Sequence, residues 1–262
     1  MTLLLILVVI ASNIVWGEWI EPPTHSSKGY RVPTPDYVPV FPRDHGSHPE
    51  HGIEWWYWVG HLNAVDSEKK FGFQSTIFRL AGDPEKSGVT QSEPFGNQNL
   101  FLVHTALSDF EEEKYIHHER VMREGWQTRS SEKTLSLTVG GVKVNLREEE
   151  DEHKVVNRYP DGAKLEVTFK PTKPLVSFGD RGLSRKGADP ASVSWYWSYT
   201  RLQAKGTLFQ NGEEIAVEGI AWMDHEISSS QLGEDLAGWD WTCMQLDDGA
   251  ELKAYRLRKK DG

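Results

Sequence analysis

The feature that most constrains the fold is a series of short segments with alternating apolar residues, which runs from residue 54 almost to the end of the chain. Turn-forming dipeptides separate these segments. Asp161-Gly162, Asn211-Gly212 and Asp248-Gly249 each lie between two of them, which is a strong short-range signal for a β-hairpin. We find no helical period longer than about two turns and no tandem repeat. The pattern therefore predicts an all-β fold, an antiparallel sandwich or barrel.

The predicted strands are residues 54–64, 70–80, 99–110, 114–122, 134–148, 154–160, 163–171, 192–210, 213–226, 238–248 and 250–260. Two longer stretches, residues 80–99 and 177–192, are rich in glycine, serine and charged residues. Their composition predicts surface flaps, and loops of this length often line binding mouths.

The first 43 residues precede this pattern and differ from it. Residues 1–17 contain an apolar run that is too short to span a bilayer and is followed by small residues, which predicts a signal peptide. No Lys or Arg precedes the run, so an uncleaved membrane tether is the alternative. Residues 18–43 are proline-rich and are predicted to form an extended arm or a linker. We expect a secreted or periplasmic protein.

Charge and cysteine content limit the partners and the sources of stability. The net charge is −10, which disfavours nucleic acid and anionic membranes as partners. We expect an apolar small molecule as the partner, with no nucleic acid and no strong membrane association beyond an uncleaved leader. Cys243 is the only cysteine, so no internal disulfide can form. Stability must come from burial, and each of the 29 aromatic rings (11 Trp, 10 Phe and 8 Tyr) can bury roughly 150–250 Å².

The first candidate site is the segment EWWYW, residues 54–58, where a carboxylate stands beside aromatic rings. In a strand, Glu54, Trp56 and Trp58 share one face, and Trp55 and Tyr57 share the other. We expect both faces to be covered, and a carboxylate among rings needs a partner or a raised pKa. Two interpretations follow: Glu54 is a catalytic group, or it is a structural residue paired with an arginine at the mouth of a barrel.

The second candidate site is AWMDHEISSS, residues 221–230, where three ionisable residues follow one another at the end of a predicted strand. Trp222, Asp224 and Glu226 share one face of this strand, and Met223 and His225 share the other. The arrangement is capable of acid–base chemistry.

Carboxylates beside aromatic residues recur along the chain, which favours a deep apolar pocket with a few polar groups. The same rings could instead be the core of a protein without disulfides. The candidate catalytic residues are Asp224, His225, Glu226 and Glu54. The candidate substrate-binding residues are Trp56, Trp58, Trp195, Trp197, Trp222, Trp239 and Trp241.

Histidines supply an alternative interpretation. His45, His48 and His51 lie three residues apart, with Asp44 and Glu50 beside them, and in a loop they could bind zinc. No HExxH motif or cysteine pair accompanies them, and the sequence has no GxSxG elbow, phosphate loop or dinucleotide fingerprint. We therefore expect neither a metal nor a cofactor.

Four parts of the sequence resemble the AttH and CrtC-like family, which includes the carotenoid hydratases (hydroxyneurosporene synthases). These are residues 41–62, 71–79, 221–230 with 238–252, and 255–262. The resemblance implies consecutive lipocalin-like (calycin) β-barrel domains, the first over residues 44–230. The second would begin within residues 231–262 and be truncated after its first hairpin. Alternatively, residues 231–262 complete the first barrel.

The resemblance also implies functional residues. In the hydratases, an Asp at the end of a Y-x-D strand and an upstream H-x-W are thought to matter. By spacing, Asp224 matches the Asp, Trp222 the Tyr, Trp197 the Trp and Trp195 the His. Two of the four positions are thus substituted, which argues against carotenoid hydration itself and leaves the acid in place.

These observations predict a secreted protein that holds a long apolar substrate, such as an isoprenoid, a polyene or a lipid-like molecule, in an aromatic cavity. Asp224, walled by tryptophans, would have a raised pKa and could protonate an alkene or an oxygen, as in hydration or hydrolysis. The alternative is a non-catalytic binding protein for an apolar ligand. A third interpretation is that the chain is inactive by itself, because the second barrel supplies one wall of the cavity.

Overall fold

The computed structural model describes residues 19–83, 99–230, 232–233 and 235–261. Over these residues the chain is antiparallel β-structure with one short 3-10 turn, η1 (Arg43–His45). The predicted all-β class is therefore confirmed. The described residues form no helix that is long and apolar enough to cross a lipid bilayer. The predicted signal peptide and most of the flap at 80–99 lie outside the described residues.

Most strands follow the predicted segments, but three short ones at residues 129–130, 176–177 and 183–185 do not, and the last lies in the stretch 177–192 that is predicted as a surface flap. Fifteen strands are present among the described residues. They are β1 (Ile53–Ala64), β2 (Lys70–Leu80), β3 (Leu100–Asp109), β4 (Lys114–Arg123), β5 (Arg129–Ser130), β6 (Ser136–Val139), β7 (Val142–Arg147), β8 (Glu152–Arg158), β9 (Lys164–Pro171), β10 (Val176–Ser177), β11 (Leu183–Arg185), β12 (Val193–Gln210), β13 (Glu213–Ser228), β14 (Leu236–Gln245) and β15 (Glu251–Lys259).

The predicted turn dipeptides connect paired strands, and the structure has one further hairpin turn that was not predicted. The β12–β13 hairpin turns at Asn211 and Gly212, whose φ angles are +54° and +82°, as a two-residue turn between twisted strands requires. The segment 134–148, predicted as one strand, is instead the hairpin β6–β7. Gly140 and Gly141 have φ angles of +57° and +96°, a conformation that glycine adopts without steric cost.

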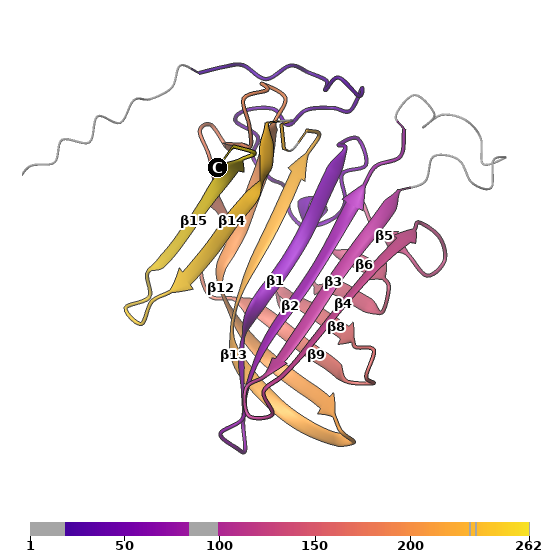
Figure 1. The fold of residues 1–262 in the computed structure, drawn as a ribbon, viewed down its shortest axis with the longest axis vertical. Helices are drawn as coiled ribbons and strands as arrows, with labels where there is room; N and C mark the ends of the chain where they lie inside the picture. The colour runs from indigo at the N-terminus through magenta and orange to yellow at the C-terminus, as the bar shows by residue number, and fades with distance from the viewer. Residues whose placement is uncertain (1–18, 84–98, 231, 234, 262) are drawn as a thin grey trace, which may run out of the picture.

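Thirteen strands form one sheet, in the order β4-β3-β2-β1-β13-β12-β9-β8-β7-β6-β5, with β10 and β11 also paired to β12. The sheet curls strongly, so that the strands at its two ends face each other (Figure 1). The long strands β1, β13 and β12 lie at its middle and carry both candidate sites. The two faces of these strands differ in what covers them.

The inner, concave face holds the main hydrophobic core. The alternating burial of β1 places Trp56, Trp58 and Leu62 in this core. Rings and aliphatic side chains from the opposite wall, such as Phe169 of β9, fill the space against them. The interior of the barrel in this region is therefore packed with side chains.

The proline-rich segment before β1 packs against the end of the barrel. Val32 is buried in a second, smaller cluster with Trp195 and Trp197, and Tyr37 stacks on Trp195 with ring centroids 4.1 Å apart. The predicted extended arm is therefore an ordered cover over one end of the inner face (Figure 1).

Strands β14 and β15 pair with each other in a separate two-stranded sheet and lie over the outer face of β12 and β13 (Figure 1). Gln245 donates to the backbone oxygens of Thr200 and Ala221, and Glu251 pairs with Lys173 and Arg201. These contacts hold the hairpin against the large sheet. The division into domains at residue 230 stays a prediction.

Candidate functional site

The sheet register separates the candidate catalytic residues into two groups. Asp224 of β13 lies between Tyr57 of β1 and Ser198 of β12, whereas His225 lies between Trp56 and Trp197. Since successive side chains of a strand point to opposite faces, Asp224 lies on the outer face under β14, and His225 lies on the inner face. Glu226 follows Asp224 to the outer face, and Glu54 lies with His225 inside.

Asp224 is buried and accepts hydrogen bonds from three neutral donors. The Tyr196 hydroxyl and the Trp222 indole nitrogen each donate over 2.6 Å, and the Ser198 hydroxyl also donates. Burial raises the pKa of Asp224 above its usual value of 3.8; the three hydrogen bonds and the charge of Lys253 offset only part of that effect. The carboxyl group is thus one that holds its proton to a higher pH than an exposed aspartate.

A cavity of about 250 Å³ opens beside Asp224, between the outer face of the large sheet and β14. Its aromatic walls are Trp55, Tyr57, Phe78, Trp239 and Trp241. Its polar lining consists of Gln74, Thr76, His104, Tyr196, Asp224 and Glu226. A cavity with aromatic walls and converging polar groups is typical of a site for a small molecule.

Glu226 is the second carboxyl group of this cavity. It accepts from Ser194 over 2.7 Å and pairs with Lys186, also at 2.7 Å. Burial raises the pKa of Glu226 despite the neighbouring ammonium group.

Lys253 of β15 approaches the same region from the hairpin. Its ammonium nitrogen lies 3.0 Å from the centre of the Phe178 ring and 3.4 Å from that of Tyr196. Burial lowers the pKa of Lys253 to about 8, although Asp224 and Glu226 favour its charged form. The hairpin therefore supplies a cation next to the two carboxyl groups.

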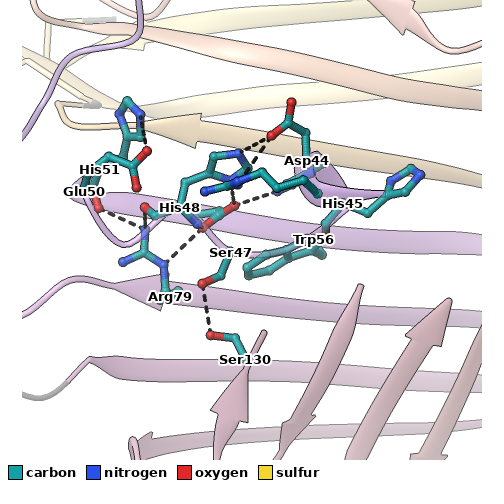
Figure 2. Close-up of polar contacts among 12 residues, drawn as sticks. Asp44, His45, Ser47, His48, Glu50, His51, Trp56, Arg79 and Ser130 are labelled. Carbon is teal, nitrogen blue, oxygen red and sulfur yellow. Dashed lines mark hydrogen bonds and ion pairs between the residues drawn. The ribbon is translucent and has the colours of Figure 1, made fainter. Parts of the chain in front are cut away.

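The inner group of residues is a buried polar network at the end of the barrel (Figure 2). Oε1 of Glu54 lies 2.8 Å from Nδ1 of His48 and 2.8 Å from Nε2 of His225. Its Oε2 accepts from the backbone N–H of His48 over 2.8 Å and from Arg79 over 3.1 Å. Nε2 of His48 lies 3.2 Å from Asp44.

Charge pairing decides the protonation of this network. Burial opposes the ionised form of Glu54, but His48, His225 and Arg79 outweigh it and hold the pKa of Glu54 well below its usual value. Burial would likewise lower the pKa of His48, yet the carboxylates of Glu54 and Asp44 raise it to about 9. The ion pair with an arginine, which the sequence left open for Glu54, is therefore what the structure shows.

The candidate residues that were predicted to line one pocket thus lie on opposite faces of one sheet. Asp224, Glu226, Trp239 and Trp241 line the outer cavity, and Trp222 lies behind Asp224 as a hydrogen-bond donor. Trp56, Trp58, Trp195 and Trp197 are buried on the inner face with Glu54 and His225. Strand alternation produces this division, because neighbouring residues cannot share a face.

The three loop histidines do not form a common group. His45 stacks on Phe41, and both ring nitrogens of the buried His51 lack a hydrogen-bond partner among the described residues. Burial lowers the pKa of His45 to about 2 and that of His51 to about 4. Of the three, His48 is the one that contacts Glu54.

Sequence reasoning missed several residues of the outer site. In β12, Tyr196 and Ser198 alternate with Trp195 and Trp197. They therefore lie on the outer face with Asp224, and the two tryptophans lie on the inner face. Trp55 and Tyr57 follow from the same rule in β1. Lys253 had no local signal, because a lysine in an alternating strand is usually exposed.

The fold and the outer cavity define a class: a lipocalin-like β protein with a buried acid beside an aromatic pocket. The chain belongs to the AttH-like family, which matches residues 32–262.

Solved structures agree with this membership. An AttH protein from Nitrosomonas europaea is 32% identical, with a TM-score of 0.76 over 88% of this chain and 68% of that one. Kievitone hydratase from Nectria haematococca has a TM-score of 0.53 and 14% identity, over 92% of this chain and 70% of that one, and shares the fold. None of the curated proteins compared with the sequence matches it.

Proposed function

We propose that this protein is a hydratase-like enzyme that protonates an apolar small molecule bound between the large sheet and β14, with Asp224 as the general acid. One observation carries the proposal: a fully buried carboxyl group with a raised pKa lies at an aromatic cavity. General acids are commonly tuned in this way by burial.

Tyr196 gives the proton a route into the cavity. Its hydroxyl is 2.6 Å from Oδ2 of Asp224 and accepts from the Trp241 indole over 3.1 Å. A hydroxyl can accept and donate at once, so Asp224 in its acid form can donate to Tyr196 while Tyr196 donates to the ligand. Both residues line the cavity.

In hydration, a proton from this relay adds to one alkene carbon and leaves a cation on its neighbour. The faces of Trp239 and Trp241 can stabilise that cation by roughly 0.5–2 kcal/mol each. Water then adds to the cationic carbon and gives up a proton, for which Glu226 is the carboxyl group within the cavity. Glu54 and His225 lie on the other face of the sheet and do not take part.

A solved structure of the same fold supports the choice of reaction class. The Nectria relative of the same fold is a hydratase, and addition of water is the chemistry that a buried acid beside cation-stabilising rings suits best. The apolar character of the substrate is inferred from the five aromatic walls. Export by residues 1–17 is part of the same proposal, and N-terminal sequencing of the product made in cells tests it.

A second candidate function is ligand binding without turnover. The observation in its favour is that both oxygens of Asp224 already accept hydrogen bonds from Trp222, Ser198 and Tyr196. A carboxylate with this many neutral donors can also serve as a fixed acceptor in a binding site.

The test is incubation with uncharged isoprenoids that carry a terminal alkene, in D₂O, followed by mass spectrometry. Hydration by this mechanism places one carbon-bound deuterium and one hydroxyl group in the product. Ligand addition should still quench the tryptophan fluorescence of Asp224→Asn, but this variant should form no product. Asp240→Asn, at an exposed position of β14, is the matched control. Unchanged turnover in Asp224→Asn contradicts the role of Asp224, and quenching without product in the wild type favours binding.

A further inference from the structure

We propose that His48, Glu54 and His225, on the inner face of the sheet, bind one divalent transition-metal ion, zinc by the chemistry of the ligands. Among the described residues these three form a group whose ligand atoms all lie within 4.8 Å of one another. They come from the loop after η1, from β1 and from β13, and each is almost completely buried. The site is separate from the Asp224 cavity and does not rest on the proposed function.

The ligand atoms converge on one point. Nδ1 of His48 and Nε2 of His225 approach the same oxygen, Oε1 of Glu54, each at 2.8 Å. Two imidazole nitrogens and one carboxylate oxygen are a recurring zinc ligand set, with metal–ligand distances of about 2.0–2.2 Å. An ion placed between these three atoms needs each pair of them about 3.3 Å apart at tetrahedral angles. The two nitrogen–oxygen distances must therefore widen by about half an ångström, and the two nitrogens, which lie within 4.8 Å of each other, must take up the same spacing.

The partners of His48 are those that a metal-bound histidine requires. Its Nδ1 faces the proposed ion, and its Nε2 lies 3.2 Å from Oδ1 of Asp44. Asp44 is itself held in place, because Oδ2 accepts from the Tyr37 hydroxyl over 2.7 Å and from the backbone N–H of Val40 over 2.6 Å. A carboxylate behind the imidazole fixes the ring orientation and the tautomer in many metal sites.

The two oxygens of the Glu54 carboxylate also have different partners. Its Oε2 accepts from Arg79 and from the backbone N–H of His48, whereas its Oε1 contacts the two imidazoles. Donors on one oxygen therefore orient the other toward the metal position.

The charges of the network allow two occupants of this point. Arg79 pairs with Glu54 and Arg43 with Asp44, and either a proton on His48 or a divalent cation can occupy the space between His48 and Glu54. The network held together by protons alone is the competing arrangement. Nδ1 of His225 has no hydrogen-bond partner among the described residues, so the two histidines differ in how firmly they are oriented.

The wild-type chain is first stripped with a chelator and titrated with ZnCl₂ by isothermal calorimetry, with elemental analysis of the stoichiometry. We expect one ion per chain with a dissociation constant of about 1 µM or lower. Co²⁺, added to the stripped protein, should give visible absorption bands of a low-coordinate nitrogen and oxygen site. Failure of the stripped wild type to bind zinc stoichiometrically overturns the proposal.

Variants then assign the site. His225→Gln keeps an amide that can donate to Glu54 and removes the ring ligand, so zinc affinity should fall more than about 100-fold, beyond the loss typical of an outer partner. His48→Asn is the second variant if His225→Gln does not fold, as judged by circular dichroism. His51→Gln, a buried histidine outside the group, should bind as the wild type does. Full affinity in both ligand variants places the ion elsewhere and refutes the assignment.

Discussion

Replacing Arg79 by Met should lower the free energy of unfolding by about 3–5 kcal/mol, the usual cost of removing one partner of a buried ion pair. The side chain is fully buried. Its guanidinium donates to Glu54 over 3.1 Å, to the backbone oxygen of His48 over 2.7 Å and to that of His51 over 2.9 Å. Methionine fills much of the volume but leaves these acceptors without a donor.

The assay is urea unfolding followed by tryptophan fluorescence, in the presence of a chelator so that metal does not contribute. For a domain of this size, the loss corresponds to a fall in Tm of about 6–20 °C. Lys154→Met is the control: it removes an ion pair of 2.6 Å with Glu166, but both side chains are more than a third exposed, so the cost should be about 0–1 kcal/mol. If the two substitutions lower the free energy of unfolding equally, the burial of an ion pair does not set its contribution to stability, and the reasoning is refuted.

Three further predictions concern the outer site and the sheet. Burial raises the pKa of Asp224 above 3.8. The protonated group therefore adds to the free energy of unfolding fully below pH 3.8, and this contribution is lost as the pH rises through the raised pKa. In Asp224→Asn, the free energy of unfolding, measured with urea at a series of pH values, should fall less steeply over that range. Lys253→Met removes a positive charge that lowers the pKa of Asp224, so the pH above which turnover is lost should move upward. An unchanged or lower value contradicts the electrostatic effect of Lys253 on Asp224. Gly206→Ala would place a Cβ 2.0 Å from the Glu166 carbonyl oxygen and should lower Tm by several degrees, whereas Gly125→Ala, with nothing within 4 Å, should not.

Much of the site could be predicted locally. The alternation of β13 placed Trp222, Asp224 and Glu226 on one face and His225 on the other, and the structure has this arrangement. The hairpins at Asp161-Gly162, Asn211-Gly212 and Asp248-Gly249 follow equally from short-range turn chemistry.

What the sequence left open was which faces meet. Glu54 and Arg79 are opposite each other only because β1 and β2 pair in that register, and Glu54 meets His225 through the pairing of β1 with β13. The charge of Lys253 acts on Asp224 because the β14–β15 hairpin lies over the outer face. None of these contacts has a local signature.

The sequence by itself therefore determined the strand periodicity, the turns and the set of residues on each face of a strand. Only the tertiary structure decided that one face of β13 holds an acid at a cavity and the other a closed network of charges. The physical reason is that side-chain direction in a strand depends on the residue's own backbone, whereas burial, ion pairing and pKa depend on partners that are distant along the chain.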